Sequence, residues 1–366
     1  MSNVNTLPPG IFAAADYIDL ARQALEEPVW HYLACGSGRE ITVRRNRGAF
    51  RNDAILPRLL RDVSAGHTRC ELAGETLAHP VLLAPVAHQS LFHGDAEFAT
   101  AQASAATDTR MIVSTLASRR LEEIRPHCAL SPWFQLYFQP RREDTLDLAA
   151  RAEAAGYGAL VVTLDSTIQS PGLNALRAGF DTRRDTDPVN LSTYPGPQPT
   201  QLRRDQSRIF QGLMQHAPGP DDLRLLLAET RLPVWVKGVL RVDDALMLRD
   251  LGVAGLVISN HGGRALDGAP ASLDVLPQIR AAVGDDYPLI LDGGIRHGGD
   301  VFIAMAKGAN AVAVGRLQAC ALAVAGPLGV AHMVRLLREE LELTMAQSGC
   351  ASLAEITADL LQKRPE

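Results

Sequence analysis

The sequence predicts an α/β fold, a closed (β/α)8 or TIM barrel with an N-terminal helical segment and a long loop after the fourth strand. Short apolar runs recur from residue 81 onward, and each is followed by a longer stretch with helical periodicity. Eight such units over roughly 250 residues are what a closed parallel barrel requires, because parallel strands need helical crossovers. The alternative is an open doubly wound sheet, but the Gly-x-Gly-x-x-Gly turn typical of that fold is missing after the first run.

We expect a single domain over residues 1–366. Residues 1–80 form a helical preface, with a helix near Ile11–Leu25 and a polar segment, Arg44–Arg51, that leads to a short extended piece. Residues 81–330 form the barrel and residues 331–366 the C-terminal helices. The expected strands are Val81–Ala84, Met111–Ser114, Trp133–Tyr137, Ala159–Asp165, Val234–Lys237, Gly255–Ser259, Leu289–Asp292 and Ala311–Gly315. Helical periodicity is clearest at Ala96–Ala106, Arg141–Ala155, Val242–Leu251, Leu273–Val283 and Gly299–Lys307.

Two further segments have a distinct composition. Residues 181–220 are rich in Pro, Arg, Asp and Gln and are too long for a tight turn, so we expect a mobile lid there. Leu317–Val334 is weakly polar but contains Gly326 and Pro327. Because a membrane span needs about 20 predominantly apolar residues, we expect a buried helix and its exit rather than a span.

Composition and charge indicate a soluble globular protein that acts on small molecules. Of the 366 residues 46% are hydrophobic and 21% charged, and the formal net charge is -5, so nucleic acid is not an expected partner. The five cysteines are scattered without a Cys-x-x-Cys pair, which predicts neither a zinc site nor a disulfide framework and favours the cytoplasm. The N-terminal residues do not read as a secretory signal, and we expect no membrane association.

Polar residues concentrate where the expected strands end. Barrel enzymes carry their reactive groups at these ends, because the eight βα loops converge there. A single polar residue at a strand end could simply satisfy an ordinary hydrogen bond there. All eight units carry such residues, which favours a functional site. They are Pro85-Val86-Ala87, Ser114, Gln135 with Tyr137, Thr163 with Asp165, Lys237, Ser259 with His261 and Arg264, Asp292-Gly293-Gly294 with Arg296, and Gly315-Arg316.

The sixth unit carries the most informative motif, Val257-Ile258-Ser259-Asn260-His261-Gly262-Gly263-Arg264-Ala265-Leu266-Asp267. An apolar strand breaks into a turn with one imidazole, two glycines and one guanidinium. The glycines allow the backbone to bend close to a ligand. We therefore interpret His261 as a proton acceptor and Arg264 as an anion-binding residue, both at the end of the same strand.

The last two units predict a phosphate site. Glycine-rich turns after strands seven and eight expose backbone N–H groups, the next helix adds its positive dipole end, and Arg296 and Arg316 can bind phosphate oxygens. Such a site implies a phosphorylated cofactor or substrate.

Lys237 ends an apolar strand, Val234-Trp235-Val236-Lys237-Gly238. A buried lysine needs a negative partner, and a cofactor that gains negative charge during the reaction would supply one. Schiff-base chemistry is the rival role. It ranks lower because His261 and Arg264 indicate an oxyacid substrate and proton abstraction.

Together these residues resemble the FMN-dependent 2-hydroxy acid oxidases and dehydrogenases, the glycolate oxidase, lactate oxidase and mandelate dehydrogenase group, with a hydroxymandelate oxidase-like member among the options. The likeness runs from about residue 28 to about residue 350. It is carried by Tyr32 with Gly36, Thr42 and Asn46, by Leu83-Ala84-Pro85, Phe134-Gln135-Leu136-Tyr137, Thr163-Leu164-Asp165, Val236-Lys237-Gly238, Ser259 to Arg264, Leu291-Asp292-Gly293-Gly294, Gly315-Arg316, and Leu343-Thr344-Met345 through Gly349-Cys350.

The resemblance implies a role for each matching position. FMN would lie across the barrel mouth with its phosphate at Arg296, Gly315 and Arg316. The other cofactor-binding residues would be Pro85, Val86, Ala87, Ser114, Gln135, Thr163, Lys237, Ser259, Asp292, Gly293 and Gly294. His261 would remove a proton from the substrate, Asp165 would hold the resulting imidazolium, and Lys237 would stabilise charge near the flavin N1. Tyr32, Tyr137 and Arg264 would bind the 2-hydroxy acid, and the family implies a homotetramer.

Three positions bear on the substrate and the electron acceptor. Gly172 stands where the family usually has an arginine that helps bind the substrate carboxylate. Arg264 could suffice alone, Arg177 could swing in, or the substrate could have a masked carboxylate. Leu116 replaces a bulky aromatic of some members and predicts room for larger, aryl substituents. Ala87 matches the small residue that accompanies oxygen reactivity, so we expect O2 as the acceptor, with a dehydrogenase using another acceptor as the alternative.

Two other functions compete with this interpretation. A phosphate-binding barrel of another reaction class, such as a prenyl diphosphate isomerase or a nucleotide dehydrogenase, would need a catalytic cysteine or a second phosphate clamp and no base at His261. A barrel that binds flavin without turnover would have no need for Asp165, Lys237, His261 and Arg264 together.

Overall fold

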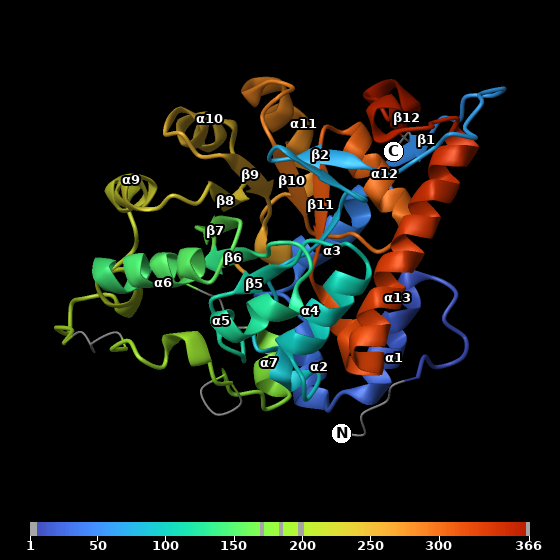
Figure 1. The fold of residues 1–366 in the computed structure, drawn as a ribbon. Coiled ribbons are helices and arrows are strands. Elements are labelled where there is room, and N and C mark those ends of the chain that lie inside the picture. Colours follow the sequence, from blue (N-terminus) through green and yellow to red (C-terminus); the bar gives the residue numbers. More distant parts are fainter. Residues whose placement is uncertain (1–5, 169–171, 183–185, 197–200, 364–366) are drawn as a thin grey trace.

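A computed structural model describes residues 6–168, 172–182, 186–196 and 201–363 of the chain. Its centre is a parallel sheet with a strand in each of the eight predicted positions (Figure 1). The strands are β4 Val81–Leu83, β5 Ile112–Ser114, β6 Trp133–Leu136, β7 Ala159–Thr163, β8 Val234–Val239, β9 Gly255–Ile258, β10 Leu289–Asp292 and β11 Ala311–Val314. The strands form a single layer, and their side chains are buried on both faces of it. This burial explains why their sequences are almost continuously apolar.

The sheet closes on itself. Its strand order is β4-β11-β10-β9-β8-β7-β6-β5, and a parallel bridge between Leu83 and Met111 joins the two end strands. Leu83 N donates to the Arg110 carbonyl at 2.9 Å across this junction. The predicted (β/α)8 barrel is therefore confirmed, and the open doubly wound sheet is excluded.

Helices surround the barrel and follow the strands in the alternating order that the sequence predicts (Figure 1). They are α4 Glu97–Ala106, α5 Leu121–Ile124, α6 Arg142–Ala154, α9 Pro220–Glu229, α10 Val242–Asp250, α11 Ser272–Val283, α12 Gly298–Ala306 and α13 Arg316–Ser348. Trp133 and Trp235 are fully buried in the core, with their ring centroids 4.8 Å apart.

The N-terminal segment is more helical than expected. It contains η1 Ala14–Asp16, α1 Tyr17–Ala24, α2 Glu27–Ala34 and α3 Ile41–Ala49, so most of the polar segment Arg44–Arg51 is helical. The expected extended piece is β1 Asp53–Ile55, which pairs antiparallel with the C-terminal strand β12 Leu361–Lys363. A hairpin of β2 Cys70–Leu72 and β3 Glu75–Leu77 follows.

The long C-terminal helix α13 crosses the expected boundary at residue 330 and breaks at Ala325 and Gly326. Gly326 has φ +55°, and a Cβ there would lie 2.8 Å from His93 Nε2, so the break requires glycine. Among the described helices α13 alone is long and apolar enough to cross a membrane by length and composition. It packs against α1, α4 and α12 and buries Leu322, Val330 and Leu337, as a core helix does. After it come η7 Leu353–Glu355 and η8 Ala358–Leu360.

The segment after β7 contains α7 Leu173–Arg177, η4 Val189–Leu191 and a π-helical turn, η5 Arg208–Leu213. The buried Asn190 fixes one part of the expected lid, because its side chain accepts from Leu121 N at 2.9 Å and donates to the Arg119 carbonyl at 3.1 Å. Residues 183–185 and 197–200 of the lid lie outside the described residues.

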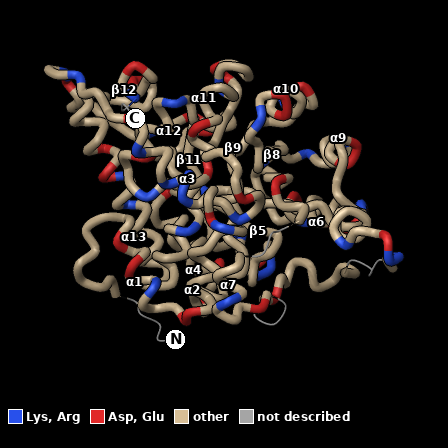
Figure 2. Tube along the Cα trace, turned by 180° about the vertical axis from the view of Figure 1, so that it is seen from behind, with Lys and Arg blue, Asp and Glu red and all other residues tan. Residues whose placement is uncertain are grey.

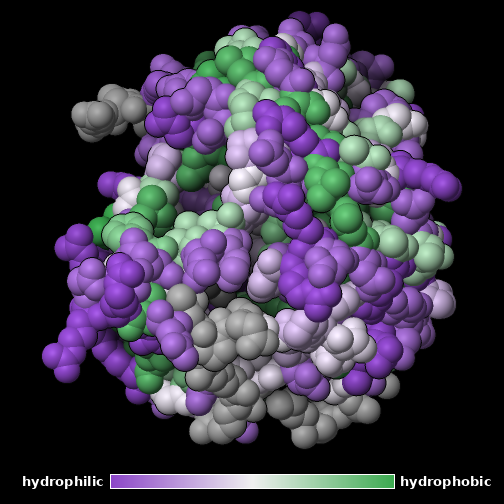
Figure 3. Space-filling view, turned by 90° about the vertical axis from the view of Figure 1, so that its left-hand side faces the viewer, coloured by the Kyte–Doolittle hydropathy of each residue, from purple (hydrophilic) through white to green (hydrophobic). Residues whose placement is uncertain are grey.

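The surface is polar and carries mixed charge. Basic and acidic residues are interspersed along the trace (Figure 2). The face over α6, α9 and α10 has mostly hydrophilic side chains with scattered hydrophobic ones between them (Figure 3).

Candidate active site

A cavity of about 380 Å³ opens at the C-terminal ends of the strands. Most of the residues singled out in the sequence line it, although they come from seven different strand ends and from α2. These are Tyr32, Pro85, Val86, Ala87, Ser114, Tyr137, Lys237, His261, Arg264, Asp292, Gly293, Gly294, Arg296, Gly315 and Arg316. Asp165, Gln135, Thr163 and Ser259 stand behind this lining and contact it.

The turn after β9 has an unusual backbone. His261, Gly262 and Gly263 are successive residues with φ of 58°, 61° and 76°. A Cβ on Gly263 would lie 2.8 Å from Val43 N, so the last of them can only be glycine. The left-handed conformation of His261 is strained for a side-chain-bearing residue, and such strain concentrates at functional sites.

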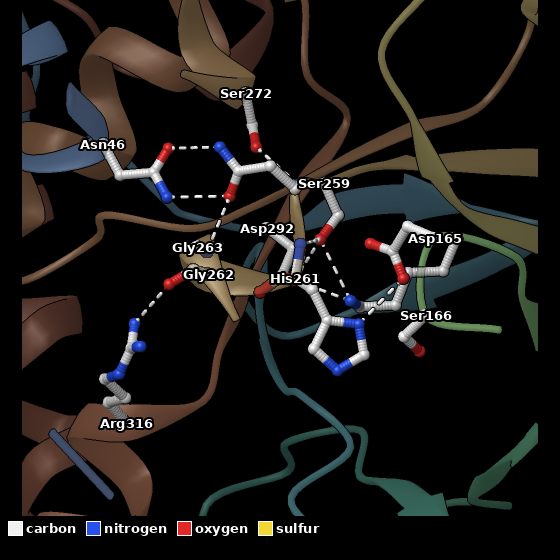
Figure 4. A network of polar contacts seen from close by, with 12 residues as sticks. Asn46, Asp165, Ser166, Ser259, His261, Gly262, Gly263, Ser272, Asp292 and Arg316 are labelled. Atoms are coloured by element: carbon white, nitrogen blue, oxygen red, sulfur yellow. Dashed lines mark hydrogen bonds and ion pairs between the residues drawn. The ribbon is translucent and has the colours of Figure 1, made fainter. Parts of the chain in front are cut away.

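A buried pair of amides holds this turn in place (Figure 4). Asn46 of α3 donates to Asn260 Oδ1 at 2.8 Å, and Asn260 donates back to Asn46 Oδ1 at 2.7 Å. Asn260 Oδ1 also accepts from Gly263 N at 3.1 Å. The N-terminal segment therefore positions the catalytic turn, which the sequence analysis did not foresee.

His261 is paired with Asp165, as predicted. His261 Nδ1 lies 2.8 Å from Asp165 Oδ1, and Figure 4 shows the other ring nitrogen pointing away from the carboxylate. Gly238 makes this approach possible: a Cβ on it would lie 2.6 Å from Asp165 Cβ. A carboxylate that accepts Nδ1–H leaves Nε2 with a free lone pair, which is the form a general base needs.

Burial and neighbouring charges set the protonation states of this pair. Burial and then the Lys237 charge lower the pKa of His261 below its ordinary value, although Asp165 acts in the opposite direction. Burial raises the pKa of Asp165, but Lys237 and the hydrogen bond from His261 outweigh it, so the net shift is downward. His261 is thus neutral and Asp165 ionised at neutral pH.

Lys237 already has a negative partner within the protein, which corrects the expectation that a cofactor supplies one. Lys237 Nζ lies 3.1 Å from Asp292 Oδ2 and donates to Ser259 Oγ at 2.9 Å, and Ser259 donates to Asp292 at 2.7 Å. Burial would lower the pKa of Lys237, but Asp292 and Asp165 raise it above its ordinary value. The ammonium is therefore a fixed positive charge, and Schiff-base chemistry is disfavoured.

Arg264, Tyr32 and Tyr137, the three residues predicted to bind substrate, all line the cavity. The Arg264 guanidinium carbon lies 4.8 Å from the centroid of the Tyr32 ring, and Arg264 donates to the Tyr32 carbonyl at 2.6 Å. Tyr32 stacks on Phe180 with centroids 4.3 Å apart. Burial raises the pKa of both tyrosines, so their hydroxyls stay protonated and can donate to a carboxylate.

The cavity also contains two partly buried guanidinium groups, those of Arg296 and Arg316, without a carboxylate in ion-pair contact among the described residues. Burial lowers the pKa of Arg296 to about 10 and, with help from the charges of Arg264 and Arg296, that of Arg316 to about 9. Arg316 donates to the carbonyls of Gly262, Cys35 and Leu33, whereas Arg296 Nε has no partner. Uncompensated buried cations beside the start of α13 fit a phosphate group.

The polar atoms behind the lining also fit FMN. Gln135 accepts from Ser114 Oγ at 3.2 Å and from Thr115 N at 3.3 Å, but its Nε2 is buried without a partner. Thr163 Oγ1 is in the same state. Buried polar atoms normally have a hydrogen-bond partner, so these two atoms are suited to bind a polar ligand such as the flavin ring. FMN bound here would supply a two-electron acceptor, with Arg296 and Arg316 holding its phosphate.

Gly172, which stands in place of the family arginine, has little free space beside its α-carbon. Gly172 lines the cavity, and a Cβ there would lie 2.6 Å from Cys35 Sγ and 3.3 Å from the Gly36 carbonyl. Arg177, the suggested substitute, is exposed at the end of α7 and donates to Asn174 at 3.2 Å. Gln169, Ser170 and Pro171 of this turn lie outside the described residues.

Several cavity residues were missed by sequence reasoning. They are Leu33, Cys35, Ser37, His88, Phe92, Ala175, Leu176, Phe180 and Thr182. Of these residues, His88 has the side chain best suited to bind or titrate. Its position three residues after Pro85, at a strand end, was a signal in the sequence that could have found it.

Comparisons with known proteins agree with this geometry. The family model for FMN-dependent dehydrogenases matches residues 21–363. An L-lactate oxidase of Alicycliphilus denitrificans is 58% identical over 361 residues, 99% of each chain, and glycolate oxidase 1 of Oryza sativa subsp. indica is 37% identical over 350 residues, 93% of each chain. A crystal structure of mandelate oxidase with (S)-2-phenylpropionate superposes with a TM-score of 0.86 at 37% identity, covering 97% of this chain and 99% of the other. The chain belongs to the FMN-dependent dehydrogenase family of oxidoreductases and uses FMN as its cofactor.

Proposed function

We propose that the protein oxidises an (S)-2-hydroxy acid to the 2-oxo acid with FMN, and that O2 then takes up the electrons and gives H2O2. The observation that carries the proposal is the 2.8 Å contact between His261 and Asp165, together with the position of His261 and Arg264 in one cavity. The substrate loses two electrons and two protons. A positioned base for one proton and a cation for the carboxylate are the protein groups that this reaction needs.

Each side chain has a defined task. Asp165 holds the Nδ1–H tautomer of His261, whose Nε2 takes the hydroxyl proton and becomes cationic. Asp165 then stabilises the imidazolium. Arg264 binds the carboxylate, and the Tyr32 and Tyr137 hydroxyls orient the substrate. Lys237, held by Asp292, supplies a fixed positive charge beside the reacting atoms.

We favour L-lactate as the first candidate substrate. The support is the 58% identity to an L-lactate oxidase over 99% of the chain. Leu116, Ala175, Leu176 and Phe180 line the cavity and suit an apolar substituent at C2. The mandelate oxidase likeness and Leu116 keep an aryl 2-hydroxy acid as the second candidate. The oxidase names of the relatives and Ala87 in the cavity wall support O2 as the acceptor.

A homotetramer in the cytoplasm completes the proposal. All five cysteines are free and buried, which suits a reducing compartment. Phe12, Leu59 and Leu60 are 87%, 81% and 103% exposed, and in the assembly that we propose these apolar side chains would contact another chain. Light scattering should give about four times the 39.4 kDa chain mass, and a monomeric mass would refute the assembly.

Anaerobic titration of the purified yellow protein tests the activity. L-lactate should bleach the flavin absorbance, D-lactate should not, and readmitted air should restore the colour with formation of H2O2. Mandelate in the same assay ranks the two candidates, and lactamide tests a masked carboxylate. Flavin that no 2-hydroxy acid bleaches would refute the function, and bleached flavin that air does not reoxidise would favour a dehydrogenase.

A further inference from the structure

His88 is a buried histidine in the wall of the active-site cavity, next to Tyr32. It is 4% exposed, and its ring centroid lies 6.5 Å from that of Tyr32. Its Nδ1 is buried without a partner, and neither ring nitrogen has a hydrogen bond to any described residue. Buried polar atoms are normally satisfied, so an unsatisfied imidazole in a cavity wall marks a place for a ligand.

The backbone fixes this ring at the cavity. His88 has φ 54° and ψ 47°, the left-handed conformation that His261 also adopts. His88 N donates to the Leu116 carbonyl at 3.0 Å, and the His88 carbonyl accepts from Leu91 N at 3.0 Å. Strained backbone of this kind persists where the surroundings hold it and is concentrated at ligand sites.

The imidazole is neutral. Burial, and next the charge of Arg264, lower the pKa of His88 to about 4. At physiological pH the ring therefore offers one N–H donor and one acceptor.

We infer that His88 binds the substrate carboxylate as a second ligand beside Arg264, by donating its N–H. It would thereby partly replace the arginine that the family usually has where this chain has Gly172. The inference rests on the proposed oxidation of a 2-hydroxy acid. Arg264 and His88 both line the cavity and both lie beside the Tyr32 ring, so we expect a carboxylate bound by the guanidinium to be in reach of the imidazole. Gly172 supplies no guanidinium beside Arg264, and the Cys35 Sγ lies 2.6 Å from where its Cβ would be.

The test measures ligand binding separately from turnover. Propanoate, a carboxylate that cannot be oxidised at C2, is titrated into the FMN-loaded enzyme while the flavin absorbance is followed. His88→Leu should raise the Kd of propanoate about tenfold, the loss expected for a hydrogen bond to a charged group. His88→Gln keeps an amide donor and should restore most of the affinity. The control His127→Leu removes an exposed histidine outside the cavity and should change nothing.

Anaerobic reduction by L-lactate provides the second readout. In His88→Leu the apparent Kd of lactate should rise about tenfold, while the limiting rate of flavin reduction changes less than about twofold. Equal propanoate affinity in wild type and His88→Leu would overturn the inference, as would a lowered limiting rate with an unchanged Kd. Failure of the proposed function looks different: the wild type then binds propanoate but is reduced by no 2-hydroxy acid.

Discussion

At the residue scale, Asp165 interacts with two basic groups and links their protonation. It accepts the Nδ1 hydrogen of His261, and it raises the pKa of the buried Lys237 together with Asp292. Lys237 in turn lowers the pKa of Asp165 and of His261. Burial and the Lys237 charge thus keep His261 unprotonated, and Asp165 keeps it oriented, so that the base is ready at neutral pH.

The pH dependence of catalysis follows from these shifts. The active form of His261 is unprotonated and its pKa lies below the ordinary 6.5, so kcat/KM should be constant above neutral pH and fall only on the acid side. In Asp165→Asn the charge that raises this pKa is lost, so the acid limb should move to lower pH. The plateau should nevertheless drop roughly 10²-fold or more, because the imidazole tautomer is no longer held.

Steady-state kinetics with L-lactate from about pH 5 to about pH 9 measures both effects in the two enzymes. A variant that keeps the wild-type plateau would show that Asp165 does not orient the base. An acid limb that moves to higher pH in Asp165→Asn would contradict the electrostatic coupling.

At the scale of elements, the N-terminal segment is part of the active site. Helix α3 supplies Asn46 to the amide pair with Asn260, and α2 ends at carbonyls that accept hydrogen bonds from Arg264 and Arg316. The barrel therefore brings the strand ends together, and the N-terminal helices α2 and α3 fix the loops that follow these strand ends.

Asn46→Ala tests this connection. The change leaves the buried Asn260 amide without its reciprocal partner, which should lower the free energy of unfolding by about 1–3 kcal/mol and slow flavin reduction by displacing the His261 turn. Asn52→Ala, an exposed asparagine just beyond α3, is the matched control and should be close to neutral. Denaturant unfolding and anaerobic stopped-flow reduction measure the two effects. Equal behaviour of both variants would show that α3 does not position the turn.

At the scale of the whole molecule, the barrel and most of the cavity could be predicted from the sequence. Each strand is a short apolar run buried on both faces, and the polar residue after it marks the same rim. Three features could not be predicted in this way. The Asn46–Asn260 pair spans 214 residues, and the arginine-rich helix α3 packs against the turn at His261. The strand-end position of His88 was visible in the sequence, but its burial and left-handed backbone were not.

The distribution of charge across the cavity gives a prediction for cofactor binding. Arg296 is partly buried and its Nε has no partner, so we expect it to contribute to FMN affinity through the phosphate. Arg296→Ala should weaken FMN binding about ten- to a hundredfold, the loss of a charged hydrogen bond, and leave riboflavin binding nearly unchanged because riboflavin lacks the phosphate. Flavin fluorescence titration of the apoprotein measures both ligands. Equal losses for FMN and riboflavin would place the phosphate elsewhere.

The central claim is that His261, oriented by Asp165, removes a proton from the substrate beside bound FMN. Anaerobic stopped-flow reduction of His261→Ala by L-lactate, with the FMN content measured in the same sample, tests it most directly. The variant should remain yellow with full FMN content, and its flavin should be reduced roughly 10²- to 10⁴-fold more slowly than in the wild type. Reduction at the wild-type rate by an FMN-loaded His261→Ala enzyme would contradict the claim.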